Sequence, residues 1–363
     1  MSDDPLLSVS NLRTEFSTPD GPLVAVDDVS FEVGRGETVC LVGESGSGKT
    51  VTCESLTRLV PESGEIADGS VEFEGSDLTE LSPSALRRIR GDRIAHVFQN
   101  PQNALDPVYS VGEQVAEAVQ YHREISDEAA RARARSLLDR VGIPNAAARL
   151  DDYPHEFSGG MRQRVVIAIA LASDPDLLVA DEPTTALDVT IETRILRLLA
   201  ELQAERDMGL LFVTHDLGVV AEIADRVVVM YAGKVMERGP VENIFERPAH
   251  PYTQALLRCL PGRGGPLEPI GGSLPDLRDP PAGCRFHPRC PHARAECKSG
   301  EQPPLYDARG RTQSASCVFY DDDHDASVVR ESARENGETS NGTKSVADGE
   351  TSDEASDGRR ERR

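Results

Sequence analysis

Hydrophobic positions follow two different periods along the chain. Three continuous apolar runs, the pattern of strands buried on both faces, lie at residues 38–42 (TVCLV), 177–181 (LLVAD) and 210–214 (LLFVT). Helical periodicity lies between or after them, around residues 48–59, 126–141, 161–172 and 190–206. Strands that alternate with helices predict an α/β fold with a mostly parallel sheet that is covered on both faces.

The N-terminal part has the period of two that is typical of half-buried antiparallel strands. This pattern occurs at residues 6–12 (LLSVSNL), 29–33 (VSFEV) and 71–75 (VEFEG). By contrast, the block from about residue 100 to 172 is largely helical and interrupts the series of strands. We therefore expect an antiparallel β subdomain at the N-terminus and an inserted helical subdomain over about 100–172.

Composition changes after about residue 240, where Pro and Gly become frequent and four of the seven cysteines crowd into residues 284–317. This change predicts a large first domain over residues 1–245 and a small, separate C-terminal extension over residues 246–320. Residues 321–363 are polar and almost devoid of large apolar side chains. Such a segment cannot bury enough surface to offset the entropy of ordering, so we expect a disordered acidic tail.

The chain shows neither of the two sequence patterns that place a protein in or across a membrane. It has no run of about 18 apolar residues, so no transmembrane helix is expected. Its N-terminus, MSDDPLLSVS, lacks a basic segment followed by an apolar core, so no secretory signal is expected either. The prediction is a protein that stays in the cytosol.

The net charge of −23 argues against a protein that wraps nucleic acid. Residues 321–363 hold 13 acidic and 7 basic side chains, so most of the excess, −17, lies on residues 1–320. Arginines outnumber lysines by 35 to four. One hypothesis is a host with a salty cytoplasm, where carboxylate-rich surfaces keep proteins hydrated. The alternative is an ordinary acidic protein from a GC-rich genome.

A phosphate-binding loop is predicted directly after the first apolar run. Residues 43–50 (GESGSGKT) fit the pattern G-x-x-x-x-G-K-[ST] between a buried strand and a helix. The glycines let the backbone N–H groups face the phosphates, and the helix adds its positive N-terminal end. Lys49 is expected to reach the β- and γ-phosphates, and the Thr50 hydroxyl to bind Mg²⁺. The whole loop is predicted to contact the nucleotide: Gly43, Glu44, Ser45, Gly46, Ser47, Gly48, Lys49 and Thr50.

A P-loop enzyme also needs an acidic residue at the end of a second strand. The segment DLLVADEP supplies Asp181 after four apolar residues, and Glu182 follows at once. We predict that Asp181 holds the Mg²⁺ shell. Glu182 then points at the γ-phosphate, where a carboxylate can polarise the attacking water, so it is the predicted general base.

With these motifs placed, the chain resembles the ATP-binding subunits of ABC transporters over roughly residues 6–320. Residues 157–163 (FSGGMRQ) are similar to that family's signature motif, usually LSGGQ, and depart from it at Phe157 and Met161. The resemblance implies a RecA-like P-loop core. It also implies a dimer in which Ser158, Gly159 and Gly160 of one chain close over the ATP on its partner's P-loop. A serine at a helix N-terminus suits a γ-phosphate.

Other residues match the family's markers in order. Gln99 matches the glutamine that contacts Mg²⁺ or the water and links the site to the helical subdomain. Asp188 in TTALD matches the loop that communicates across the dimer, and His215 matches the switch histidine that contacts the γ-phosphate. Phe16 is the candidate for stacking on adenine, with a packed strand-end phenylalanine as the alternative.

Within the family, VGESGSGKT, FQNPQNALDPVYSVGEQ and ERPAHPYTQALL look like importers of oligopeptides, dipeptides or nickel. The resemblance implies an ATPase on the cytoplasmic face of the membrane, with ATP and Mg²⁺ as cofactors. Implied partners are a second ATPase subunit, expected to be a paralogue, two membrane permeases and an extracellular substrate-binding protein. Carbohydrate or nickel cargo, and a soluble ABC ATPase that acts on DNA or the ribosome, are the alternatives; no nucleic-acid partner is expected.

Four cysteines, Cys284, Cys290, Cys297 and Cys317, lie in the Pro-rich extension. A small module with little hydrophobic core is often stabilised by a cross-link such as a disulfide or a bound metal, and disulfides are disfavoured in a reducing cytosol. The spacing fits neither the paired cysteines of zinc sites nor the ferredoxin patterns, so the residues alone indicate only a metal site. Some peptide importers of the resembling type carry an iron–sulfur cluster here, which favours [4Fe–4S] over zinc or no metal.

Overall fold

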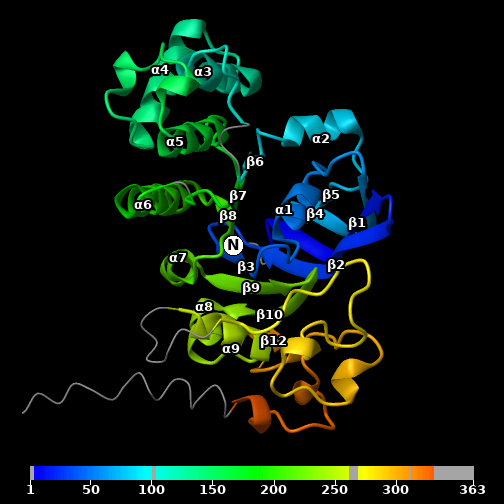
Figure 1. The fold of residues 1–363 in the computed structure, drawn as a ribbon. Coiled ribbons are helices and arrows are strands. Elements are labelled where there is room, and N and C mark those ends of the chain that lie inside the picture. Colours follow the sequence, from blue (N-terminus) through cyan, green and yellow to red (C-terminus); the bar gives the residue numbers. More distant parts are fainter. Residues whose placement is uncertain (1–3, 100–103, 186, 261–268, 311, 331–363) are drawn as a thin grey trace, which may run out of the picture.

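The computed structural model describes residues 4–99, 104–185, 187–260, 269–310 and 312–330. Two β-sheets and the helices around them make up this part of the chain (Figure 1). Among the described residues, no helix is both long enough and apolar enough to cross a membrane.

The larger sheet runs in the order β11-β12-β10-β9-β3-β8-β7-β6. Its strands are β3 (Thr38–Val42), β6 (Ile94–Val97), β7 (Leu177–Asp181), β8 (Gly209–Val213), β9 (Arg226–Tyr231), β10 (Lys234–Pro240), β11 (Tyr306–Asp307) and β12 (Ser314–Ala315). The pairings from β9 through β3, β8 and β7 to β6 are parallel. All three predicted apolar runs are confirmed as central strands, and every residue of β3, β7 and β8 is buried.

The smaller sheet is antiparallel, in the order β2-β1-β4-β5, as the N-terminal alternation predicts. Its strands are β1 (Leu7–Thr18), β2 (Gly21–Val33), β4 (Gly64–Phe73) and β5 (Ser76–Asp77). Leu7 pairs with Val33 on one side and with Phe73 on the other. These buried side chains share one core with Val39 and Leu41 of β3, so the alternating face packs against the parallel sheet.

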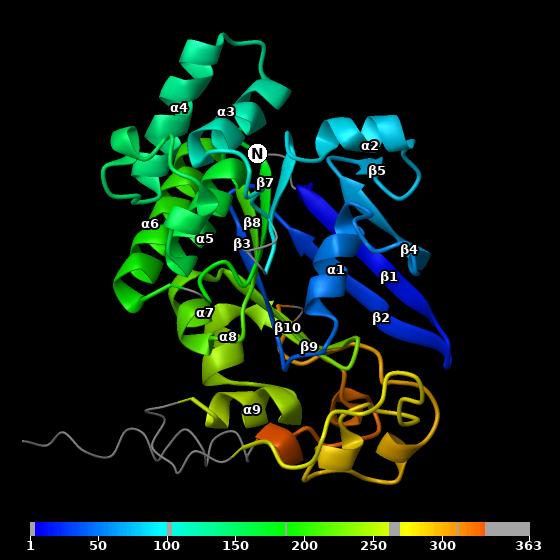
Figure 2. The same ribbon diagram turned by 45° about the horizontal axis from the view of Figure 1, so that its top comes forward.

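The helices divide between the two faces of the larger sheet (Figures 1 and 2). On one side lies α1 (Lys49–Leu56), together with the antiparallel sheet. On the other side lie α5 (Gly159–Ala170), α6 (Val189–Arg206) and α7 (Leu217–Ile223). The short α2 (Pro83–Ile89) follows the antiparallel sheet.

The predicted helical block contains α3 (Val111–His122), α4 (Asp127–Arg140) and α5. Ser110 and Glu113 form a reciprocal capping box that starts α3, and Ser126 caps α4. Residues 100–103, at the start of the predicted block, lie outside the described residues. The four predicted helical segments are found as α1, α4, α5 and α6.

The C-terminal extension is joined to the larger sheet rather than standing apart from it. Helix α8 (Val241–Glu246) leads into the extension, which contains α9 (Pro251–Arg258), and its strand β12 pairs with β10. The described chain continues past the predicted tail boundary at residue 320: Val329 is fully buried, and its carbonyl accepts a hydrogen bond from Gln254. Packing against α9 gives these residues the buried surface that their composition alone did not indicate. The rest of the predicted tail, residues 331–363, lies outside the described residues.

Candidate nucleotide-binding site

The predicted phosphate loop connects β3 to α1 and has a backbone that only glycine tolerates at two positions. Gly43 has φ of +154° and Gly48 has φ of +99°. A Cβ atom would lie 2.1 Å from the Met230 carbonyl oxygen at Gly43, and 2.5 Å from the Ala25 carbonyl oxygen at Gly48. At Gly46 a Cβ would meet no neighbouring atom, but φ is +79°. Glycine is therefore favoured there by the backbone conformation and not by a steric contact.

Lys49 lies at the centre of this loop with only 7% of its surface exposed. Its Nζ donates hydrogen bonds to the carbonyl oxygens of Gly43 (2.8 Å) and Glu44 (2.9 Å). Burial lowers the pKa of Lys49, and the nearby charges of Glu182 and Asp181 oppose that shift. Among the described residues, Lys49 donates to carbonyl and hydroxyl oxygens rather than to a carboxylate, so its ammonium group can pair with an anion at the loop.

Asp181 ends β7 and meets Thr50, the first-turn hydroxyl of α1. It is 5% exposed, and the Thr50 hydroxyl bonds to its carboxylate. Burial, together with the charge of Glu182, raises the pKa of Asp181. Among the described residues, the buried Oδ1 of Asp181 has no hydrogen-bond partner. A buried carboxylate oxygen of this kind is costly unless a cation or a proton reaches it, so the donor set fits Mg²⁺.

A cavity of about 310 Å³ opens beside the side chains of Thr50 and Asp181. Thr50, Gln99 and Asp181 are in its wall, which comes from α1, β7 and the segment after β6. The structure therefore brings Gln99 to the same place as the two predicted metal-binding residues.

Glu182 follows Asp181 in the chain, but both of its carboxylate oxygens have side-chain partners. Its Oε1 lies 3.2 Å from His215 Nδ1, and the Thr185 hydroxyl donates to its Oε2 at 3.1 Å. Burial acts to raise the pKa of Glu182, but hydrogen bonds with Gln99 and His215 outweigh it and bring the pKa below its usual value. Glu182 also has φ of +48°, a sparsely populated conformation for a non-glycine residue that recurs at functional sites.

The second glycine-rich segment forms the N-terminus of α5. Ser158 is the N-cap, and its Oγ accepts from the Met161 N–H at 3.3 Å. Ser158 and Gly159 are exposed, and a Cβ at Gly159 would meet nothing within 4 Å. Gly160 follows half-buried, and its carbonyl accepts from Arg164. The helix start therefore presents an open backbone to its surroundings.

The two glycine-rich segments belong to different parts of the molecule. Helix α1 packs against β1, β2 and β7, whereas α5 packs against α3, α4 and β6. Figures 1 and 2 both show the two helices on opposite sides of the larger sheet. The chain therefore does not gather its two predicted phosphate-binding segments into one site of its own.

Two further predicted residues have visible local roles. Asp188 is the N-cap of α6 and accepts from the N–H groups of Thr190 and Ile191, both at 3.1 Å. Phe16 is half-buried on β1, and its ring covers Gly64 on the neighbouring β4. Neither contact tests the predicted dimer communication of Asp188 or the predicted adenine stacking of Phe16.

The four C-terminal cysteines converge. Cys284, Cys297 and Cys317 are buried, Cys290 is partly buried, and none of them forms a disulfide. Burial raises the pKa of Cys284 to about 12 and that of Cys290 to about 11, and neighbouring thiols of the same set add to both shifts. However, within the part of the chain described here, no three His, Cys, Asp or Glu side chains are arranged to hold a metal ion. The structure thus groups the thiols without forming a metal geometry.

Sequence reasoning missed two residues at this site, because both come from the C-terminal extension. The Tyr252 hydroxyl accepts from the Glu44 N–H at 2.9 Å, and Arg289 forms an ion pair with the Glu44 carboxylate. Arg289 lies 245 positions from Glu44 in the sequence. No local spacing relates residues so far apart, so only the folded chain reveals the contact.

The fold and the site define a P-loop ATPase, and comparison with known proteins narrows this class. Residues 26–185 match the ABC transporter family, and residues 236–297 match the family described as oligopeptide/dipeptide transporter, C-terminal region. A putative peptide import ATP-binding protein of Brucella abortus is 51% identical over 296 residues, covering 81% of this chain and 89% of the relative. One from Brucella melitensis is 52% identical over 320 residues, covering 84% and 94%.

Solved structures agree. A dimeric ATP-binding cassette in a post-hydrolysis state, bound to ADP and Pi, is similar with a TM-score of 0.60 and 28% identity, covering 65% of this chain and 98% of that one. A subunit of an ABC transporter complex from Clostridium perfringens follows with a TM-score of 0.57 and 28% identity, covering 67% and 91%. The chain belongs to the ATP-binding subunits of ABC transporters, in the group that carries the oligopeptide/dipeptide transporter C-terminal region. The fold class and the family that the motifs indicated are confirmed, and its activity is ATP hydrolysis.

Proposed function

We propose that this chain is the energy-coupling ATPase of an ABC importer for dipeptides or oligopeptides. The C-terminal match to oligopeptide/dipeptide transporters and the names of the relatives from Brucella support the peptide cargo. The observation that carries the ATPase role is the convergence of Lys49, Asp181 and Glu182 around the end of β7, where one Asp181 oxygen has no hydrogen-bond partner among the described residues. That arrangement is what phosphoryl transfer to water needs.

Each residue then has one task in ATP hydrolysis. Lys49 and the N–H groups of the loop bind the β- and γ-phosphates, while Thr50, Asp181 and Gln99 hold Mg²⁺. When bound, the cation neutralises charge on the phosphate oxygens. Glu182, ionised by its hydrogen-bond partners, polarises the attacking water, and His215 contacts the γ-phosphate.

The second phosphate-binding segment completes the site of a partner chain. Ser158, Gly159 and Gly160 are exposed or half-exposed at a helix start that lies away from the P-loop of their own chain. In the dimer, each ATP lies between the P-loop of one chain and the serine-glycine segment of the other. Both phosphate-binding segments of a chain therefore have a nucleotide to bind. Phe16 stacks on adenine, and Asp188 links the two sites. The other chain is a paralogous ATPase.

The rest of the transporter follows from this role. The dimer docks from the cytoplasmic side on two membrane permease subunits, and an extracellular binding protein delivers the peptide. ATP-driven closure of the dimer is the rigid-body change that drives the permeases. Co-purification with two integral membrane proteins, and ATPase stimulation by peptide-loaded binding protein, test these partners and exclude a soluble ABC ATPase.

Substitution Glu182→Gln tests the mechanism. The amide cannot act as a base, so ATP turnover should fall by about 100-fold or more while ATP still binds and traps the closed dimer. Phosphate release and size-exclusion chromatography in ATP measure the two effects. Glu201→Gln, at an exposed position of α6, is the matched control and should hydrolyse ATP normally. Wild-type turnover by Glu182→Gln would remove this residue from the base role.

We also propose a [4Fe–4S] cluster at the four C-terminal cysteines. The support for it is their convergence: Cys290 and Cys297 help to raise the pKa of Cys284, and Cys284, Cys290 and Cys297 help to raise that of Cys317. A metal at the site requires the thiols to move closer than they stand here. Iron and sulfide analysis of anaerobically purified protein tests this proposal. Stoichiometric zinc would replace the cluster, and the absence of both metals would leave a packed thiol core.

A further inference from the structure

The second residue of the P-loop, Glu44, is bound by an arginine of the cysteine-rich segment, residues 284–317 of the C-terminal extension. Arg289 Nη1 donates to Glu44 Oε2 at 2.6 Å, and Nη2 donates to Oε1 at 3.0 Å. The side chain of Arg289 is only 4% exposed, whereas that of Glu44 is 25% exposed. This is the two-bond geometry in which arginine binds a carboxylate most strongly.

The remaining N–H groups of Arg289 are also used. Its Nε donates to the Gly271 carbonyl at 2.7 Å, Nη2 to the Ile270 carbonyl at 3.0 Å, and Nη1 to the Tyr231 hydroxyl at 3.2 Å. A guanidinium has five N–H donors, and all five have an acceptor here. Burial disfavours the charge, but the bonds to Glu44 and Tyr231 outweigh it and raise the pKa of Arg289. Arg289 is therefore fixed in one position.

The extension also holds the backbone of the same residue. The Glu44 N–H donates to the Tyr252 hydroxyl at 2.9 Å, and the Tyr252 ring lies 4.7 Å from Tyr231 and 5.2 Å from Phe286. Tyr252 and Phe286 are almost completely buried. Side chain and backbone of Glu44 are thus both anchored to residues that follow the ATPase core.

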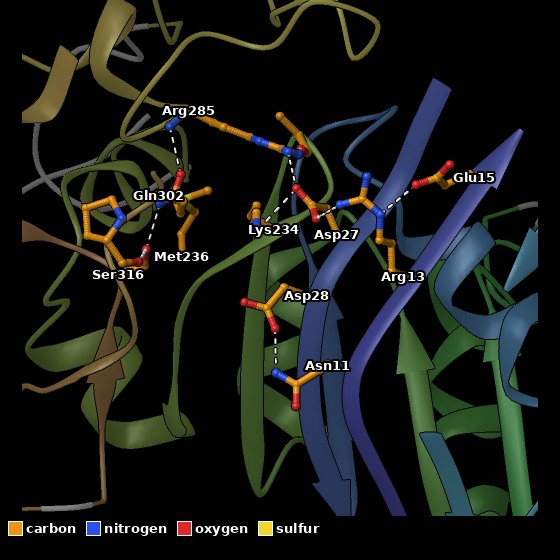
Figure 3. Close-up of polar contacts among 12 residues, drawn as sticks. Asn11, Arg13, Glu15, Asp27, Asp28, Lys234, Met236, Arg285, Gln302 and Ser316 are labelled. Carbon is orange, nitrogen blue, oxygen red and sulfur yellow. Dashed lines mark hydrogen bonds and ion pairs between the residues drawn. The ribbon is translucent and has the colours of Figure 1, made fainter. Parts of the chain in front are cut away.

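A second arginine of the same segment, Arg285, is anchored to strand β2 (Figure 3). The Ala25 carbonyl of the same strand lies against Gly48 of the P-loop. Arg285 pairs with Asp27, and Lys234 pairs with the same carboxylate at 3.2 Å. The Arg285 N–H donates to Gln302 Oε1 at 2.9 Å, which fixes the backbone from the other side, as Figure 3 shows. The segment that carries Arg289 is consequently anchored at Arg285 through both its side chain and its backbone.

We propose that Arg289 is a positioning residue of the nucleotide site, which fixes the P-loop through Glu44 and neutralises a carboxylate that would otherwise repel the nucleotide phosphates. The inference rests on the proposed ATPase site and adds a residue from outside the ATPase core to it. Because Arg289 is fixed and Glu44 is the more exposed partner, the arginine sets the position of the glutamate and not the reverse.

Binding of Mg·ATPγS to the full-length chain tests this role, together with the KM and kcat for ATP. In Arg289→Ala the dissociation constant and KM should rise at least about tenfold, because an unpaired carboxylate then lies beside a polyanion. The rise should shrink in high salt. Arg278→Ala, in the same extension and paired only loosely with Asp20 at 3.9 Å, is the control and should bind like wild type.

The double variant Glu44→Gln/Arg289→Ala separates charge from packing. If Arg289 neutralises Glu44, removing the carboxylate should restore most of the lost affinity, whereas a purely structural defect would not be rescued. Arg289→Lys keeps the charge but loses the second bond, so it should bind at least about threefold more weakly than wild type. If Arg289→Ala does not fold, Arg289→Lys is the variant that tests the proposal.

Three results would overturn the inference: affinity of Arg289→Ala within about twofold of the control, no rescue by the double variant, or wild-type affinity in Arg289→Lys. Failure of the wild-type chain to bind Mg·ATPγS is a different outcome, because it contradicts the proposed function itself.

Discussion

Two neighbouring carboxylates show how environment divides chemical roles at the scale of single residues. Asp181 is buried beside the charge of Glu182, and its pKa is raised. The pKa of Glu182 is lowered, because hydrogen bonds with Gln99 and His215 outweigh its burial. Shifts in opposite directions suit a cation-binding residue and an ionised base at adjacent positions. Sequence order alone gives the pair but not this difference.

Burial of a single histidine predicts acid sensitivity. His250 is completely buried at the N-cap of α9, and burial lowers its pKa to about 3 from 6.5. The folded state therefore keeps the imidazole neutral, while the unfolded chain binds a proton below pH 6.5. This contribution to stability is complete above that pH and is lost as the pH falls towards 3, by about 2 kcal/mol between pH 7 and pH 5.

Urea unfolding at these two pH values measures the loss. In His250→Asn the difference between pH 7 and pH 5 should be smaller than in wild type by about 2 kcal/mol, because asparagine does not titrate yet can still accept from the Tyr252 N–H. His155→Asn, at an exposed position, is the control and should keep the wild-type difference. An unchanged difference in His250→Asn would show that His250 is not the source of the acid sensitivity.

At the scale of elements, the two phosphate-binding segments both lie at helix N-termini. The steric surroundings of their glycines differ. In the P-loop, Gly43 and Gly48 are required because backbone oxygens would collide with a Cβ. At α5, the position of Gly159 is open within the chain. The fold therefore sets no steric requirement for glycine at position 159, which leaves its backbone accessible to the proposed partner nucleotide.

Substitution Gly159→Ala should therefore separate folding from function. The melting temperature should stay at or above the wild-type value, since alanine favours a helix by about 0.5–1 kcal/mol over glycine. ATP turnover by the dimer should fall by about tenfold or more, because the added methyl group blocks the approach to a γ-phosphate. Glu201→Ala, at an exposed position of α6, is the control and should change neither quantity. Normal turnover by Gly159→Ala would argue against the shared ATP site.

At the scale of the whole molecule, the C-terminal extension and the ATPase core form one structure. Strand β12 continues the larger sheet through β10, and the extension reaches Glu44 in the P-loop. Ion pairs at Asp174 gather Arg123 from the C-terminal end of α3, Arg133 from α4 and Arg206 from α6. Ion pairs do not change the net charge of the chain, which remains −23.

This excess makes stability dependent on salt, because like charges repel and screening relieves the repulsion. The free energy of unfolding should rise steadily between about 0.05 M and 2 M KCl if the chain comes from a salty cytoplasm. Equilibrium denaturation at each concentration measures it, with sucrose as a control for volume exclusion without screening. A flat response to KCl would favour the ordinary acidic protein.

The sequence by itself determined the elements of the core and the chemistry of their loops. Apolar runs predicted β3, β7 and β8, and the P-loop and the Asp181-Glu182 pair followed from residue types at strand ends. These are local signals, in which neighbouring residues decide the backbone conformation. The strand β9 has the same kind of apolar run, RVVVMY, but was not predicted as a strand.

Only the tertiary structure decided which distant residues meet. The pairing of β12 with β10, the burial of Val329 and the contact of Arg289 with Glu44 each join segments that are far apart in the sequence. So does the convergence of the cysteines, whose spacing fits neither the paired cysteines of zinc sites nor the ferredoxin patterns. The physical reason is that such contacts depend on how whole layers pack, and hydrophobic periodicity specifies the face that a segment buries but not the partner that covers it.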